Sequence, residues 1–202
     1  VKERLFGANR FYLDLKKAIG KKKKNIPDGY LLDISGRKPR LFVVENELGI
    51  HDPLRHIAVQ LLEFSLAFED GPHSVKKVLA CALSSDTDAS ARCAEYAVQH
   101  GYSSVDHLLE HLVFESPFTA LVIIDEVPDK LEAVLTDKFK FGIEVLQLTR
   151  YEDAEHVKLY EFEPFLSDVT DSSDEQEGLS YTNPVDASDI DTIVVPARLD
   201  GF

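Results

Sequence analysis

The sequence has few cysteines and no methionine. Only two of its 202 residues are Cys, and both lie in apolar segments, Cys81 in the run VLACAL and Cys93 in a helical pattern. We therefore expect two reduced core residues of a cytoplasmic protein, and neither a disulfide nor a cysteine metal site. Because the sequence has no Met at all, we also expect it not to be a primary translation product.

Several signatures that would define a function are missing as well. No apolar run is long enough to span a bilayer and no signal peptide opens the sequence, so no membrane partner is expected. There is no Gly-rich phosphate loop, no Ser nucleophile elbow and no Cys/His zinc spacing. The composition, 44% hydrophobic and 29% charged, is that of an ordinary globular protein that can bury a full core.

The net charge of −14 is unevenly distributed along the chain. Residues 1–41 hold 12 Lys or Arg against 4 Asp or Glu, whereas residues 168–202 hold 1 against 9. The basic part includes a run of four lysines shortly before a Pro-Asp pair: Lys21, Lys22, Lys23 and Lys24. Such a run suits the positioning of a phosphodiester substrate, and a solvated loop that keeps the chain soluble is the alternative.

Apolar runs and breaker residues divide the chain into alternating strands and helices. We expect strands at 29–34, 39–46, 75–85, 119–125, 143–151 and 157–165, and helices at 1–19, 53–68, 87–100, 104–114 and 129–139. This order predicts an α/β domain over residues 1–166, with a mixed central β-sheet flanked by helices, opened by a hairpin and extended by crossovers. The acidic, polar residues 167–188 predict a flexible linker, and 189–202 the strand-like start of a further, missing domain.

The first hairpin concentrates three carboxylates. If its turn is centred near Arg37, Asp28 lies opposite residue 46, with a register error of one or two. Glu45 and Glu47 are two residues apart and therefore share a strand face. Carboxylates this close need a compensating cation, and oxygen-only ligands favour Mg²⁺ or Mn²⁺. The alternative is a solvated edge strand, but the preceding apolar run LFVV is typical of a central strand.

Further polar residues are expected near these carboxylates. Asp52-Pro53 predicts a helix start, and His56 and Gln60 lie four apart on one face of that helix. Because the helix begins only a few residues after Glu47, this face can overlook the carboxylates. Asp125-Glu126 ends a buried strand, where α/β proteins place functional groups, although a plain strand exit has the same pattern.

These motifs resemble the PD-(D/E)xK nuclease superfamily, which has a restriction endonuclease-like core. Pro27-Asp28 matches the first half of the motif, and Glu45-Asn46-Glu47 stands where the family has (D/E)-x-K. The helix that carries Gln60 is similar to the Gln-bearing helix of the RecB-like branch. The resemblance covers residues 1–68 and extends to about 165 in element order. The sequence departs from the family motif at Glu47, where Lys is usual. Some restriction endonucleases of the superfamily also have Glu at this position.

The resemblance implies a Mg²⁺- or Mn²⁺-dependent nuclease, acting on DNA or RNA. Asp28 and Glu45 would be metal ligands together with the backbone carbonyl of Asn46, and Glu47 would act either as a general base or as a ligand to a second metal ion. Gln60 would join the three carboxylates as a catalytic residue. The four lysines and His56 would contact the substrate. The alternatives are an inactive nuclease-like module that binds nucleic acid or a protein partner, and a regulatory module whose tail carries the function. A homodimer partner or a C-terminal domain is also expected.

Overall fold

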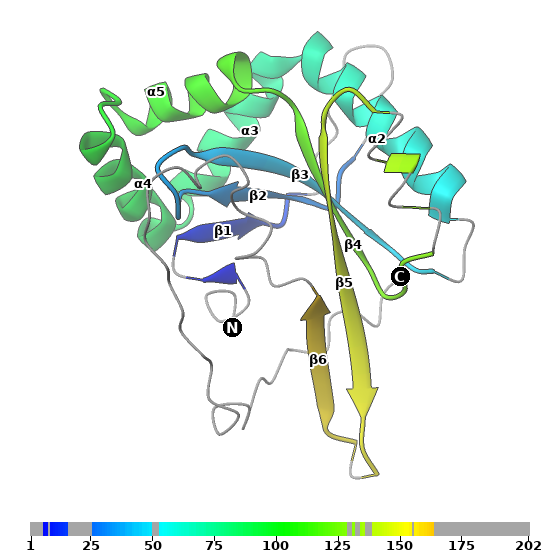
Figure 1. Cartoon of the computed structure of the whole chain (residues 1–202). Coiled ribbons are helices and arrows are strands. Elements are labelled where there is room, and N and C mark those ends of the chain that lie inside the picture. The colour runs from blue at the N-terminus through cyan, green and yellow to red at the C-terminus, as the bar shows by residue number, and fades with distance from the viewer. Residues whose placement is uncertain are drawn as a thin grey trace.

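The computed structural model describes residues 6–7, 9–15, 26–49, 53–128, 131, 134–135, 139–154 and 156–163. Within these ranges the strands are β1 (Arg10–Leu13), β2 (Gly29–Asp33), β3 (Arg40–Glu47), β4 (Thr119–Ile124), β5 (Gly142–Glu152) and β6 (Lys158–Glu163). The helices are α2 (Pro53–Asp70), α3 (Pro72–Ser84), α4 (Thr87–Gln99) and α5 (Val105–Glu110), and α5 continues into a π-helical turn, η1 (His111–Glu115). Figure 1 shows how these elements are arranged.

The six strands form one mixed sheet in the order β1-β2-β3-β4-β5-β6. Strands β1, β2 and β3 are antiparallel neighbours, β3, β4 and β5 run parallel, and β6 returns antiparallel beside β5. Four helices connect β3 to β4, as parallel pairing requires a long crossover. The expected α/β class is thus confirmed, with a mixed sheet that a hairpin opens and crossovers extend.

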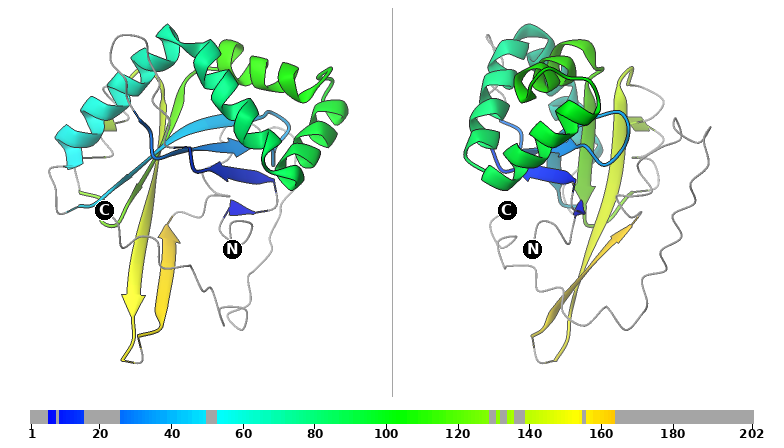
Figure 2. Two further views of the ribbon diagram at one scale, coloured as in Figure 1. Left: turned by 180° about the vertical axis from the view of Figure 1, so that it is seen from behind. Right: turned by 90° about the vertical axis from the view of Figure 1, so that its left-hand side faces the viewer.

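The described helices cover one face of the sheet, as the two views in Figure 2 show. The main hydrophobic core lies between this face and the helices, where α2 contributes Ile57, Leu61 and Phe64 and the sheet contributes alternate residues such as Leu41 and Val43. The intervening strand residues point to the other face. There a smaller cluster forms from Phe6, Leu31, Phe42, Val44, Leu121, Ile123 and Leu146.

The sequence-based assignment was wrong in two segments. Residues 75–85 form most of helix α3 instead of a strand, because Val75, Leu79 and Leu83 follow each other at four-residue spacing and are all buried. The same change leaves Cys81 exposed, while Cys93 is buried as expected. Residues 10–13, which were expected to be helical, form edge strand β1, whose Leu13 faces the helices.

Other expected elements are present with small shifts at their ends. The helices expected at 53–68, 87–100 and 104–114 correspond to α2, α4 and α5 with η1, and five expected strands correspond to β2 to β6. Most of the expected helix 129–139, and the linker and strand-like segment beyond 163, lie outside the described residues. Within the described part of the chain, no helix has the length and apolarity needed to traverse a bilayer.

Buried polar contacts fix the β2–β3 hairpin at its turn. Asp33, only 3% exposed, accepts hydrogen bonds from Arg10 Nε at 3.0 Å and Arg40 Nη2 at 3.1 Å, and from the backbone and side chain of Ser35. Burial alone would raise the pKa of Asp33, but the Ser35 bonds and the Arg10 charge outweigh it, so the pKa is lowered. The Tyr96 hydroxyl of α4 lies 2.9 Å from the Arg37 carbonyl oxygen and holds the turn against the helices.

Candidate functional site

The three motif carboxylates, Asp28, Glu45 and Glu47, lie at the end of the sheet where strand β3 finishes. Gly29 pairs with Val44, so the next opposed positions are Asp28 and Glu45, one residue from the expected register. Glu45 and Glu47 continue the alternation of Leu41 and Val43 and therefore belong to the face that α2 covers. The structure thus brings Asp28 and Glu45 together beneath the helix that carries His56 and Gln60.

Glu45 is the most deeply buried of these carboxylates, with 5% of its surface exposed. Its pKa is raised to about 8, first by burial and then by the charges of Asp28 and Glu47, while a hydrogen bond from the Gln60 side chain acts in the opposite direction. Asp28, Glu47 and Gln60 are therefore each within interaction range of Glu45. In the absence of a cation, the Glu45 carboxyl retains its proton at neutral pH.

Asp28 is held in place from two sides. Its Oδ2 accepts a 2.9 Å hydrogen bond from the Asn46 backbone N–H, and its backbone carbonyl accepts one of 3.3 Å from the Tyr12 hydroxyl. Tyr12 also bonds to the Asn46 side chain. Gly29 makes this arrangement feasible, because a Cβ at that position would lie 2.6 Å from the Tyr12 ring. Tyr12 therefore braces Asp28 and Asn46 from the face opposite α2.

Glu47 has two partners of its own. Its Oε1 accepts a 3.0 Å hydrogen bond from the Leu48 backbone N–H, and its Oε2 pairs with His56 Nδ1. The Glu47 side chain is 7% exposed, whereas that of His56 is 59% exposed. Glu47 thus presents a largely buried carboxylate with the His56 imidazole beside it.

Three buried side-chain oxygens in this region have no hydrogen-bond partner among the described residues: Glu45 Oε2, Gln60 Oε1 and the Tyr30 hydroxyl. Tyr30 pairs with Val43, two residues from Glu45 on the same side of the sheet. A buried polar atom without a partner is costly, so such atoms indicate a place for a donor or a cation. Sequence analysis did not identify Tyr30, although its two-residue spacing from Asp28 signals a shared face.

The loop after β3 is anchored to the end of β4. The Gly49 backbone N–H donates a 2.6 Å hydrogen bond to Asp125 Oδ1, and a Cβ at Gly49 would lie 3.1 Å from the backbone of Glu126. This contact joins residues 76 positions apart. Asp125 is consequently more than a plain strand exit, since it fixes the segment that leads from Glu47 towards α2.

The oxygen atoms at this site are of the kind that a hard divalent cation prefers as ligands. Among the described residues, however, the carboxylate groups do not point to one common position. Among the described residues, no three His, Cys, Asp or Glu side chains form a ready-made metal site. The hydrogen bonds of Asp28 and Glu47 explain this, because each carboxylate is turned to a backbone N–H. The oxygen atoms available, including the orphaned Glu45 Oε2, are nevertheless those that Mg²⁺ and Mn²⁺ prefer. The chemistry of the site therefore fits such an ion.

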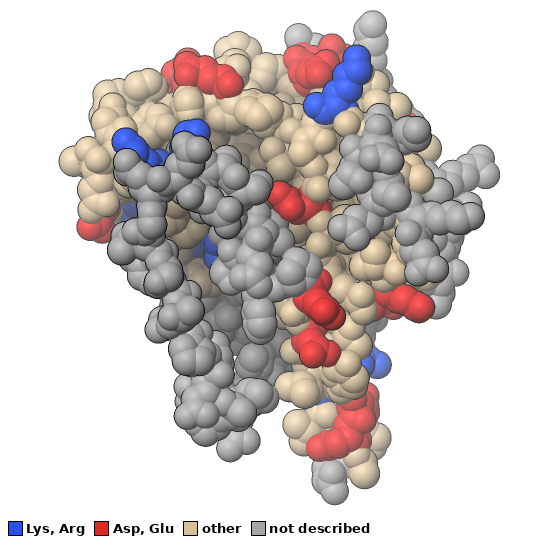
Figure 3. All heavy atoms as spheres, viewed as in Figure 1, with Lys and Arg blue, Asp and Glu red and all other residues tan. Residues whose placement is uncertain are grey.

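Of the residues expected to contact the substrate, only His56 lies in the described part of the chain. His56 lies at the site, whereas Lys21, Lys22, Lys23 and Lys24 lie outside the described residues. Acidic side chains predominate over basic ones on the described surface in Figure 3, including the β5–β6 hairpin. The described part of this face therefore offers little positive charge to a polyanion.

Fold and site together define an α/β protein with a mixed six-stranded sheet and, where β3 ends, a buried carboxyl group, Glu45, on which the charges of Asp28 and Glu47 act. No protein-family model, curated protein or solved structure matches the chain.

Proposed function

We propose that the chain is a metal-dependent nuclease of the PD-(D/E)xK type that hydrolyses phosphodiester bonds. One observation carries the proposal: buried Glu45 lies between the charges of Asp28 and Glu47, with one carboxylate oxygen unpartnered. Burial and these two charges raise the pKa of Glu45 to about 8, so a positive charge beside it would favour its ionised form. A divalent cation would supply that charge.

The proposed ligands follow from the chemistry of the site. Asp28 and Glu45 would hold Mg²⁺ or Mn²⁺, with the Asn46 backbone carbonyl as a further ligand by analogy with the superfamily. Glu47 would add a carboxylate ligand that the superfamily Lys does not supply. When bound, such an ion polarises the scissile phosphate and lowers the pKa of a water. Tyr12 and the Asn46 N–H keep Asp28 in position for this role.

Proton transfer falls to Glu47 and His56. The Glu47 carboxylate accepts the proton of the attacking water, since it stands where the superfamily Lys would orient that water. His56 Nδ1, paired with Glu47 Oε2 and more than half exposed, passes the proton to solvent. Gln60 donates its amide N–H to Glu45 and so supports the ionised form of that carboxylate.

A second function is favoured by a specific observation. Glu47 replaces the motif Lys, and the face in Figure 3 is predominantly acidic where it is described. An inactive nuclease-like module that binds nucleic acid or a protein partner would have both properties. An assay of nucleic-acid cleavage distinguishes the two functions, because only the nuclease would cleave.

The direct test is cleavage by the purified chain. With Mg²⁺ or Mn²⁺, the protein should nick plasmid DNA or cleave RNA, and EDTA should stop the reaction because it removes the ion. Crystals soaked in Mn²⁺ should show anomalous density between Asp28 and Glu45. Salt-dependent binding of nucleic acid without cleavage, under every metal tried, would favour the binding module instead.

Glu47→Lys tests the departure from the motif. If Glu47 occupies the place of the superfamily Lys, the variant should retain or increase cleavage, because Lys orients the water and stabilises negative charge. Single-turnover rates in Mg²⁺ would measure this. Complete loss of cleavage, with an unchanged circular dichroism spectrum, would instead show that the Glu47 carboxylate itself is required, as a metal ligand or as the proton acceptor. The matched control is Glu95→Lys, the same charge change on the exposed surface of α4.

A further inference from the structure

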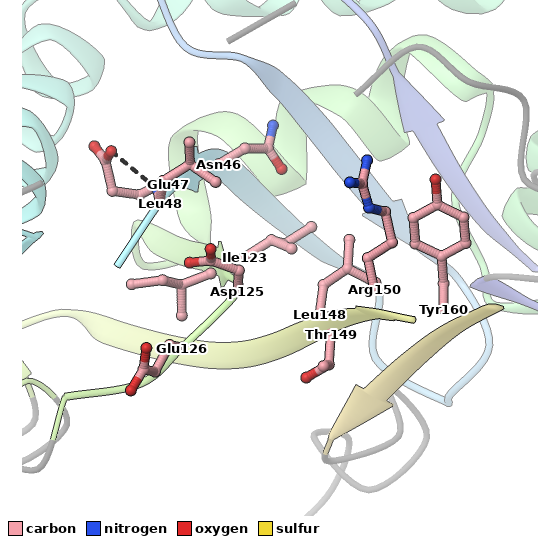
Figure 4. Close-up of a pocket in the computed structure, with 11 residues that line it drawn as sticks. Asn46, Glu47, Leu48, Ile123, Asp125, Glu126, Leu148, Thr149, Arg150 and Tyr160 are labelled. Carbon is pink, nitrogen blue, oxygen red and sulfur yellow. Dashed lines mark hydrogen bonds between the residues drawn. The ribbon is translucent and has the colours of Figure 1, made fainter. Parts of the chain in front are cut away.

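A cleft of about 470 Å³ opens beside the carboxylate site. Figure 4 shows its lining, and we call it the strand-end cleft. Its walls come from the ends of β3 and β4, from the loops that follow them, and from β5 and β6: Asn46, Glu47, Leu48, Ile123, Ile124, Asp125, Glu126, Leu148, Thr149, Arg150 and Tyr160. Crevices at the carboxyl ends of parallel strands are common ligand sites in α/β sheets.

The strand-end cleft is continuous with the carboxylate site but lies mainly on the other face of the sheet. Ile123 belongs to the hydrophobic cluster opposite the helices, and Leu148 packs against that cluster. Glu47 lines the cleft and also acts on the pKa of Glu45. A ligand in the cleft would therefore adjoin the proposed metal ligands.

The two ends of the strand-end cleft differ in charge. Glu47, Asp125 and Glu126 lie towards one end in Figure 4, and Arg150 and Tyr160 lie at the other. Arg150 and Tyr160 are directly opposed on β5 and β6. Between the two ends lie Ile123 and Leu148, which give the middle of the cleft an apolar wall. The end with Arg150 thus suits a phosphate, and the apolar middle suits a sugar and base.

We propose that the strand-end cleft binds one unpaired nucleotide of the cleaved strand, with its phosphate on Arg150. This inference rests on the proposed nuclease function and adds the substrate class, namely single strands or frayed ends. The cleft volume is within the range of roughly 300–1,000 Å³ that small-molecule pockets have. A base that stays paired and stacked in a duplex cannot enter such a pocket without being extruded.

Binding to the full chain tests the proposal without cleavage. Fluorescence anisotropy with Ca²⁺ in place of Mg²⁺ would compare a labelled 12-nucleotide single strand with the blunt duplex of the same sequence. The single strand should bind at least about tenfold more tightly, since the duplex must first lose pairing and stacking. Equal or tighter binding of the duplex would overturn the proposal.

Arg150→Gln locates the contact, and Arg37→Gln is the matched control. Both arginines are exposed, but Arg37 lies at the β2–β3 turn and does not line the strand-end cleft. Arg150→Gln should weaken single-strand binding about tenfold, because a charge-assisted bond to phosphate is lost, while Arg37→Gln should change it less than about twofold. Unchanged melting temperatures would show that both variants fold.

The outcomes separate this inference from the proposed function. Cleavage by the wild type with equal single-strand affinity in Arg150→Gln and Arg37→Gln would overturn the cleft assignment and leave the nuclease proposal standing. Single-strand binding that depends on Arg150, with no cleavage in any metal, would overturn the nuclease proposal and support the cleft. Absence of single-strand binding by the wild type would overturn the cleft assignment directly.

Discussion

Asp28→Ala and Glu45→Ala should each reduce nucleic-acid cleavage by more than about 1,000-fold. Removing either carboxylate loses the ion or displaces it, and with it several kcal/mol of transition-state stabilisation. Initial rates with Mg²⁺ and with Mn²⁺ would measure the loss. Neither variant should unfold, because Asp28→Ala removes a charge that raises the pKa of Glu45, and Glu45→Ala removes the buried ionisable group itself.

Glu95→Ala is the control for this experiment. Glu95 is an exposed carboxylate on α4, away from the β3 edge, so this variant should cleave at the wild-type rate. Parallel purification of all three variants also tests for a contaminating nuclease. Cleavage by Asp28→Ala or Glu45→Ala at the rate of Glu95→Ala would contradict the metal site.

Glu45→Gln should stabilise the metal-free protein at alkaline pH. The pKa of Glu45 is about 8 in the folded state and near 4.5 in the unfolded state, so the folded state binds more protons between these values. The free energy of unfolding of the wild type therefore falls as the pH rises from 4.5 to 8, and it falls no further above 8. Glutamine cannot ionise and so removes this loss of stability, which is on the order of 5 kcal/mol for a shift from 4.5 to about 8.

Urea denaturation in EDTA at pH 5 and pH 9 would measure the difference. The two proteins should have similar stability at pH 5, and Glu45→Gln should be the more stable at pH 9. Adding Mg²⁺ at pH 9 should stabilise the wild type alone, because only ionised Glu45 binds the cation. Equal stability at pH 9 in EDTA would mean that Glu45 ionises without penalty.

The β2–β3 hairpin could be predicted from the residues of its own segment. Gly36 and Pro39 mark the turn, and the strand lengths then fix the register to within one residue. The run LFVV correctly indicated a central strand, since β3 has neighbours on both sides. The positions of Asp28 and Glu45 followed from these two local features.

The remaining features depended on long-range contacts. The run VLACAL suits a strand as well as a buried helix, and only the spacing of Val75, Leu79 and Leu83 distinguishes them. Tyr12 and Asp125 acquire their roles from partners on other strands and loops, 16 and 76 residues away. No window of the sequence contains both partners of such a contact. The strand-end cleft likewise combines four strands that only the folded sheet brings together.

The packing of Tyr12 over Gly29 links two positions that are distant in the sequence. Any side chain at position 29 would overlap the Tyr12 ring, so glycine is required for as long as position 12 is tyrosine. Related chains should therefore change the two positions together, with a larger residue at 29 only where 12 is small. A chain without Tyr12 would keep the Pro27-Asp28 pair but lose the hydrogen bond from the Tyr12 hydroxyl to the Asp28 backbone carbonyl. Covariation of positions 12 and 29 would therefore show whether related chains retain this contact.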